Sequence, residues 1–184
     1  AGGVGLAAVE LGVAMGARVI AAASSEEKLA LAKAHGASAG LVYPRGPFDA
    51  AGTKALAGQF KEATGKQGAD VIYDAVGGDY AEAALRAIAW EGRFLVVGFP
   101  AGIPRIPLNL PLLKGCQIVG VFWGSFCDRE VVVNRENVRE LCQFYNAGKI
   151  KPHVSAHYSL ADAGQGIRDL AARRALGKIV IMID

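Results

Sequence analysis

The sequence lacks several features that define large classes of proteins. Its three cysteines, Cys116, Cys127 and Cys142, are an odd number without the Cys-x-x-Cys spacing of zinc or redox sites. No apolar run approaches the roughly 18 to 20 residues that span a bilayer, because glycine, proline or charge interrupts every apolar stretch. We therefore expect a reduced, cytoplasmic chain without disulfides and without a membrane partner.

A large charge excess of one sign is also absent. The 184 residues include 20 lysines and arginines against 17 aspartates and glutamates, a formal net charge of +3, and no block of basic residues. This balance argues against a nucleic-acid partner, which a basic stripe would attract. At 52% hydrophobic and 20% charged residues, the composition also excludes a disordered segment. What remains is an ordered globular chain that suits small ligands, including anions.

Short apolar runs alternate along the chain with longer segments of helical periodicity. We predict strands at residues 18–23, 40–43, 69–74, 93–98, 118–122, 154–158 and 178–182. We predict helices at residues 3–15, 26–35, 48–64, 80–89, 131–147 and 160–172, and an irregular connection across the prolines of residues 100–111. This alternation is typical of an α/β fold with a doubly wound, mostly parallel sheet, whose ligands lie beyond the carboxyl ends of the strands.

The glycine turn at residues 2–5 carries the clearest chemistry. Glycines allow a tight turn and a close approach of a diphosphate, while the free amides and the dipole of the following helix favour an anion. The full dinucleotide fingerprint needs a strand before the turn, and the sequence does not show one. A glycine-rich loop that serves only helix packing is the alternative.

The end of the next predicted strand indicates which nucleotide the turn would bind. An NAD site usually has a carboxylate there for the ribose hydroxyls, but Ala22 and Ala23 occupy this place, followed by Ser24 and, one turn into the helix, Lys28. Hydroxyl and ammonium groups favour a 2′-phosphate, and hence NADP. Lys28 as an ordinary exposed helix lysine is the alternative. Residues 24–27 also predict a capping box with Ser24 at the N-cap.

A set of short motifs stands in a fixed order along the chain. It comprises GGVGLAA at 2–8, VIAAASSEEK at 19–28, GA at 36–37, Tyr43, DAVGG at 74–78, GRFLVVGF at 92–99, LLK at 112–114, GVFWG at 120–124 and GKIV at 177–180. Together these motifs resemble the medium-chain dehydrogenase/reductase superfamily, and within it the zinc-free NADPH:quinone oxidoreductase branch. The resemblance covers essentially the whole chain.

The resemblance implies a two-lobed enzyme in which this chain is the Rossmann-type, NADPH-binding lobe. Gly2, Gly3 and Val4 would then lie under the pyrophosphate of the cofactor. Two further sets of residues are implied to surround its 2′-phosphate and its nicotinamide half: Ser24, Lys28 and Tyr43 for the first, and Val76, Gly77, Val97, Gly98, Phe122 and Trp123 for the second. Core aromatics after a buried strand are the alternative for Phe122 and Trp123.

The resemblance also implies that parts of the enzyme are not in this sequence. The first strand of the sheet and the amino-terminal, GroES-like lobe are missing, so we treat the chain as a fragment that is inactive alone. Residues 1–150 would form the cofactor domain, and residues 151–184 would belong partly to the missing lobe. Residues 116–122 would form an edge strand through which two copies pair as a homodimer.

We assign no catalytic acid or base and no metal site to this chain. His35 stands before Gly36 at a helix end, where a helix contact explains it. His153 and His157 have the spacing of a helical metal pair, but a strand there would hold them roughly 13 Å apart, too far for one ion. The cofactor would carry the difficult chemical step.

These observations favour an oxidoreductase that transfers hydride from NADPH to a quinone or a similar α,β-unsaturated carbonyl. An enoyl-thioester reductase of the same superfamily and a non-enzymatic NADPH-binding relative remain as alternatives. A methyltransferase is disfavoured, since it would need an acid where Ala22 and Ala23 stand.

Overall fold

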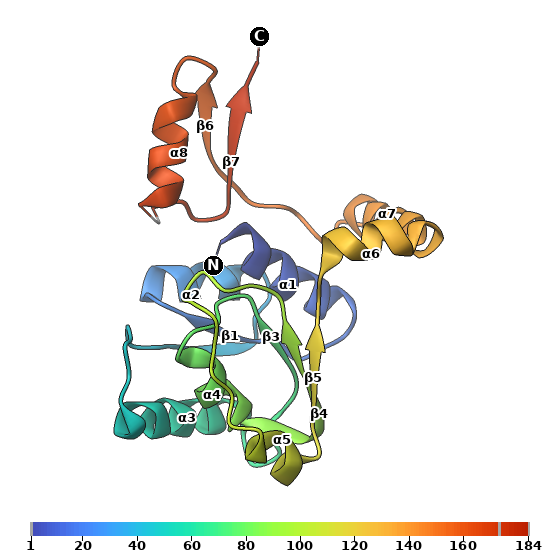
Figure 1. Cartoon of the computed structure of the whole chain (residues 1–184). Coiled ribbons are helices and arrows are strands. Elements are labelled where there is room, and N and C mark those ends of the chain that lie inside the picture. The colour runs from blue at the N-terminus through green and yellow to red at the C-terminus, as the bar shows by residue number, and fades with distance from the viewer. Residues whose placement is uncertain (1, 173, 184) are drawn as a thin grey trace. The chain divides into compact units, whose positions relative to one another are not determined.

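The computed structural model describes residues 2–172 and 174–183 and divides the chain into two compact units. The first unit combines the residues up to 39 with those from 141 onward, and the second unit consists of residues 40–140. Figure 1 shows the elements of each unit. We describe each unit by itself.

The first unit contains two groups of elements from opposite ends of the chain. The amino-terminal group is α1 (Gly3–Ala14), β1 (Ile20–Ala23) and α2 (Glu26–Ala34), and the carboxyl-terminal group is β6 (Val154–Ser159), α8 (Ala163–Ala171) and β7 (Lys178–Met182). Leu6, Val9 and Leu29 are buried in the first group. In the second group β6 and β7 pair in parallel, and Gly166 lets α8 approach them closely. Helix α7 (Val131–Asn146) and strand β2 (Ala39–Val42) cross the division between the units.

The second unit is built on a parallel sheet of three strands in the order β3, β4, β5. Its elements are α3 (Ala50–Thr64), β3 (Ala69–Asp74), α4 (Tyr80–Leu85), β4 (Ile88–Val96), α5 (Asn109–Lys114), β5 (Gln117–Gly120) and α6 (Trp123–Arg129). Side chains from α4, β4 and α5 form one apolar cluster, centred on Leu85, Ile88 and Phe94. Leu56 and Ala57 of α3 form a second cluster with Ala83 of α4.

The register of this sheet brings the carboxyl ends of its strands together. Asp74 is opposite Val96, and Val96 is opposite Gly120. The loops that follow the three strands therefore leave from the same edge, which we call the carboxyl edge. It is where a ligand is expected in an α/β sheet.

The predicted α/β class with parallel pairing is confirmed, and the bounds of β3 and β7 agree with the prediction. Helix α2 ends, as predicted, before a glycine in the left-handed region, Gly36 at φ +103°. Strand β5 ends the sheet of the second unit, so the predicted edge is present. Pairing of this edge with a second copy stays a prediction.

Four local predictions were wrong. Ser25, not Ser24, caps α2, because its hydroxyl accepts the Lys28 amide at 3.3 Å. The helix predicted to reach residue 89 ends at Leu85, since the Ala87 carbonyl accepts the Ala69 amide and carries the chain into β4.

The other two wrong predictions concern helices that the sequence reading missed. Helix α5 lies partly in the segment expected to be irregular and tolerates Pro111 in its first turn, where no amide is needed. Residues 121 and 122 leave the strand early, and α6 begins at Trp123.

The described residues contain no helix that is both long enough and apolar enough to cross a membrane.

Hydrogen bonds to the Asp169 carboxylate connect β6, α8 and the segment before β7, and we call this set of bonds the clasp. The Tyr158 hydroxyl donates to Asp169 Oδ2 at 2.5 Å, and Arg174 and Gln165 donate to Oδ1 of the same carboxylate. The Tyr158 bond, followed by those of Arg174, lowers the pKa of Asp169 below its ordinary value of 3.8. The same bond raises the pKa of Tyr158 above 10.0.

Replacing Tyr158 with Phe is expected to lower the melting temperature of the chain at neutral pH. The pKa of Asp169 is lower in the folded chain than in the unfolded chain. The stabilisation that the clasp contributes is therefore fully present above the unfolded-state pKa, and it is lost as the pH falls through the folded-state pKa. The melting temperatures of wild type and Tyr158→Phe should therefore converge below pH 3.8. Circular dichroism melts across this range measure the difference. Tyr145→Phe on α7 is the control, and a wild-type-to-variant difference that is independent of pH would contradict the assignment.

Candidate functional site

The glycine turn opens α1 with its amides free of any side-chain cap. Gly2 is the N-cap residue, with extended backbone angles of φ −93° and ψ 176°, and no described side chain caps it. Neither this conformation nor packing requires a glycine, since a Cβ built on Gly2 would meet no described atom within 4 Å. The turn therefore leaves room at a helix N-terminus where an anion can approach the backbone.

Lys178, the first residue of β7, lies beside this turn. A Cβ built on Gly3 would be 3.6 Å from Cγ and Cε of Lys178 and 3.8 Å from its Cδ, so the lysine side chain runs along the glycine. Its ammonium is one bond further on and adds a mobile positive charge near the helix N-terminus. Sequence reasoning missed Lys178 because it treated residues 177–180 as a family motif and residues 178–182 as a strand, and assigned no ligand to this lysine. A lysine at the first position of that strand is the one local signal.

Ser24 and Lys28 lie together at the start of α2, as the predicted 2′-phosphate site requires. The Lys28 ammonium donates to the Ser24 hydroxyl at 3.4 Å, and both residues are half-buried. Because Ser25 caps the helix instead, the Ser24 hydroxyl is released from the capping role predicted for it. The two adjacent carboxylates, Glu26 and Glu27, are exposed in the first turn of the helix.

In the second unit, six of the predicted residues follow the strands at the carboxyl edge. Asp74 ends β3, and its Oδ1 accepts the amides of Val76 and Gly77, both at 2.9 Å. The Asp74 carbonyl accepts the Val97 amide at 2.9 Å, which joins this loop to the one after β4. Asp74 therefore shapes the two loops, and its bonded Oδ1 is not the free base of a proton transfer.

The two predicted glycines of these loops have different reasons to be glycine. Gly77 is buried at φ +72°, and a Cβ there would lie 2.6 Å from the Gly102 carbonyl oxygen, so the fold itself requires it. Gly98 has no such constraint, because a Cβ would meet its nearest atoms at 3.9 and 4.0 Å. At Gly98 the missing side chain leaves open space at the carboxyl edge, which is what a bound ring would need.

Phe122 and Trp123 follow β5 at the same edge. The Val121 amide still donates to the Val96 carbonyl at 2.9 Å, after which Phe122 caps α6 and Trp123 begins it. Their exposed fractions are 80% and 69%. The alternative reading of these residues as core aromatics is therefore wrong for this unit.

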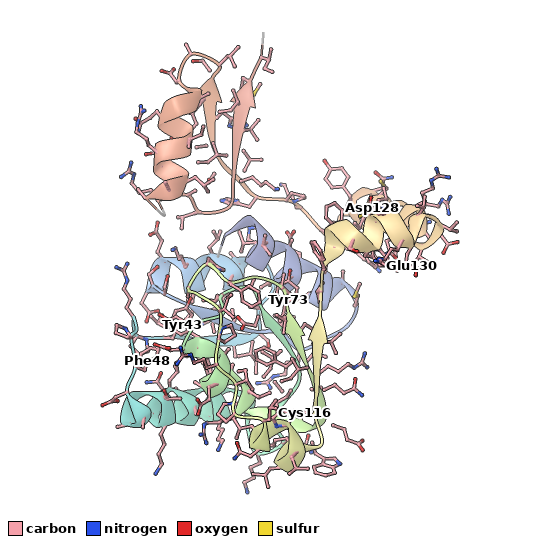
Figure 2. The ribbon with its side chains drawn as sticks, in the orientation of Figure 1. Tyr43, Phe48, Tyr73, Cys116, Asp128 and Glu130 are labelled. Atoms are coloured by element: carbon pink, nitrogen blue, oxygen red, sulfur yellow. The ribbon has the colours of Figure 1, made fainter. Side chains whose placement is uncertain are left out.

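Tyr43 follows β2 and belongs to an aromatic group of the second unit. Its ring is 4.9 Å from that of Tyr80, which also packs edge-on against Phe48 at 5.3 Å. Figure 2 labels Tyr43 and Phe48. The Tyr80 hydroxyl accepts the Gly46 amide at 3.1 Å, so the segment after Tyr43 is fixed to α4.

Each unit thus contains some of the residues that the sequence predicts to bind the cofactor. The first unit places the glycine turn and the Ser24 and Lys28 pair on its amino-terminal elements, and the second unit places the predicted loop residues at its carboxyl edge. Residues 2–172 and 174–183 contain no group of three or more histidine, cysteine, aspartate or glutamate side chains that could hold a metal ion. Within the second unit, partial burial raises the pKa of Tyr73, beside Asp74, above its ordinary value of 10.0.

Comparison with protein families gives one match over most of the chain. A family model described as zinc-binding dehydrogenase matches residues 3–146. Among curated proteins, the quinone oxidoreductase-like protein 2 homolog of Nematostella vectensis is 38% identical over 184 residues, which are 98% of this chain and 48% of that protein.

Solved structures give similar matches. A mycobacterial protein complexed with NADPH is 30% identical, with a TM-score of 0.83 over 100% of this chain and 55% of the other. The Escherichia coli quinone oxidoreductase complexed with NADPH is 26% identical, with a TM-score of 0.80 over 100% of this chain and 55% of the other. The chain therefore spans about half the length of the relatives it matches.

Replacing each of the two loop glycines with alanine is expected to have different effects on stability. Gly77→Ala should lower the free energy of unfolding by about 1 to 3 kcal/mol, because it combines a strained backbone with a steric clash. Gly98→Ala should change the free energy of unfolding by less than about 0.5 kcal/mol, because its Cβ has room. Urea unfolding of both variants measures this, and equal losses would show that the space at Gly98 is not available.

Proposed function

Because the chain belongs to the zinc-binding dehydrogenase family, in the medium-chain dehydrogenase/reductase superfamily, we propose that it is the NADPH-binding part of an oxidoreductase that reduces quinones or similar α,β-unsaturated carbonyls. The observation that carries the proposal is the uncapped N-terminus of α1, with open space at Gly2 and Lys178 beside Gly3. Two similar structures are complexed with NADPH, which supports the choice of cofactor.

The pyrophosphate is proposed to lie on the first turn of α1. The amides that follow Gly2 donate to it, and the helix dipole favours its charge. Lys178 supplies a neutralising ammonium. Since Lys178 lies beyond residue 150, the proposed cofactor site draws on residues 151–184 as well as on the predicted cofactor domain.

The 2′-phosphate is proposed to bind at the start of α2. Ser24 and Lys28 already lie within 3.4 Å of each other, so a phosphate that accepts from both needs little rearrangement. No carboxylate stands at the end of β1 to bind the ribose hydroxyls that an NAD site would hold. We propose Tyr43 as a third donor, as the family resemblance implies.

The nicotinamide half is proposed to lie at the carboxyl edge of the second unit. The cofactor supplies the hydride when it is bound, and the residues of this edge orient the ring and exclude water. Asp74 accepts the amides of Val76, Gly77 and Val97 and so holds these residues in place. Gly98 leaves room for the ring, and Phe122 and Trp123 offer exposed aromatic faces. We assign no proton transfer and no metal to this chain, and we propose that its reaction needs no zinc.

The substrate is proposed from the names of the relatives, one of which is a quinone oxidoreductase. A protein that includes this chain at the full length of those relatives should oxidise NADPH with 1,4-benzoquinone. The chain alone should not, since we propose that the other half supplies most of the substrate pocket. Absorbance of NADPH over time measures both. Turnover with an enoyl thioester and none with quinones would assign the alternative activity, and no turnover with either would favour a non-enzymatic NADPH-binding protein.

The chain should prefer NADPH to NADH by at least about tenfold. Each charge-assisted hydrogen bond to the 2′-phosphate contributes on the order of 1.5 to 3 kcal/mol, and Ser24, Lys28 and Tyr43 offer up to three. Lys28→Ala should weaken NADPH binding and leave NADH almost unchanged, and Tyr43→Phe should do the same more mildly. Fluorescence titrations with both cofactors measure these affinities.

Lys33→Ala is the matched control, because Lys33 is an exposed lysine on the same helix. Equal losses of NADPH and NADH binding in Lys28→Ala would mean that Lys28 acts on folding or on the pyrophosphate. Equal wild-type affinities for the two cofactors would remove the 2′-phosphate assignment.

A further inference from the structure

Glu10 is the one charged side chain that the described residues bury, with 8% of its surface exposed. A buried carboxylate is costly unless hydrogen bonds compensate for its lost hydration. Glu10 Oε1 has two such partners: Nδ1 of His35 at 2.8 Å and the Lys151 amide at 3.0 Å. Because a carboxylate only accepts, the proton of this bond lies on Nδ1 of His35. One oxygen on α1 thus holds the end of α2 and the start of the carboxyl-terminal segment.

A continuous series of contacts leads from this carboxylate to Lys178. The His35 ring lies edge-on to that of His153, with centroids 5.4 Å apart. The His153 carbonyl accepts the Lys178 amide at 2.9 Å. Gly177, at φ +120°, packs so closely on His153 that a Cβ would lie 2.7 Å from that carbonyl oxygen. The backbone of Lys178 is therefore fixed by His153.

The series begins and ends on α1. Glu10 and Gly3 lie on the same helix, about two turns apart, and the Lys178 side chain runs along Gly3. Helix α1 therefore holds the carboxyl-terminal segment at Glu10 and receives the side chain of Lys178 at its N-terminus. The helix that offers the free amides also determines where the lysine stands.

We propose that Glu10 and His35 are positioning residues for the anion site at the N-terminus of α1, acting through His153 on Lys178. The inference rests on the proposed function, since it requires the pyrophosphate to bind at this helix end. It assigns to the buried pair a role in ligand affinity in addition to its role in holding the first unit together.

The test uses two probes that separate the two phosphate positions. ADP carries the pyrophosphate without a 2′-phosphate, and 2′-AMP carries the 2′-phosphate without a pyrophosphate. Lys178→Met should weaken ADP about tenfold, the loss of one charge-assisted contact, and should leave 2′-AMP within about twofold. Glu10→Ala should weaken ADP by a similar factor and spare 2′-AMP. Glu10→Gln keeps an acceptor oxygen for Lys151 and His35 and should restore most of the affinity.

The decisive measurement is the double variant. If Glu10 acts through Lys178, adding Glu10→Ala to Lys178→Met should change the ADP affinity by less than about twofold. Calorimetric titration gives the affinities, thermal melts report folding, and Glu62→Gln on α3 is the control for an exposed carboxylate. If Glu10→Ala does not fold, the same cycle is run with His35→Ala.

Four results would overturn the inference. Glu10 and His35 variants that bind ADP like wild type would assign the pair a structural role only, as would a loss that persists in the Lys178→Met background. Equal weakening of ADP and 2′-AMP would indicate a general loss of structure. Wild type that binds neither probe would overturn the proposed function itself, and this inference with it, so the two failures are distinguishable.

Discussion

The free amides at the start of α1 are the constraint on which the rest of the proposed site depends. A side chain of the N-cap residue can satisfy the first amides of a helix, as Ser25 does for α2 and Asp49 does for α3. The N-cap residue of α1 is Gly2, which has no side chain, and no described side chain takes its place. The amides and the nearby Lys178 together make this end of the helix a position that an anion would stabilise.

Two pairs of glycines differ in whether the fold explains them. Gly77 and Gly177 have left-handed backbones and backbone atoms in the place of a Cβ, so the fold explains them. Gly2 and Gly98 have neither, so the fold leaves them unexplained. A cofactor that approaches the backbone at both positions would explain them.

Sequence reasoning succeeded where the signal is local and failed where it depends on distant residues. The glycine turn, the Ser24 and Lys28 pair and the carboxyl edge follow from motifs within a few residues, and the structure contains each of them. The N-cap was missed by one residue because the capping-box pattern fits Ser24 and Glu27, whereas the folded backbone places Ser25 at the N-cap. Lys178 and Glu10 could not be found in this way, because their neighbours, Gly3 and Lys151, lie at the opposite end of the chain.

The division of the chain also has a consequence for how it folds. The second unit is continuous in sequence, so its parallel sheet can form from contacts within residues 40–140. The first unit is not continuous in sequence. Its hydrogen bond between Glu10 and the Lys151 amide closes a loop that contains the whole second unit. Closing a flexible loop of that size costs about 4 kcal/mol of chain entropy, and less if the second unit has already folded, because a folded unit is more compact than a flexible chain. The folding order with the lowest cost in chain entropy is therefore one in which the second unit folds first and the two ends of the chain join last.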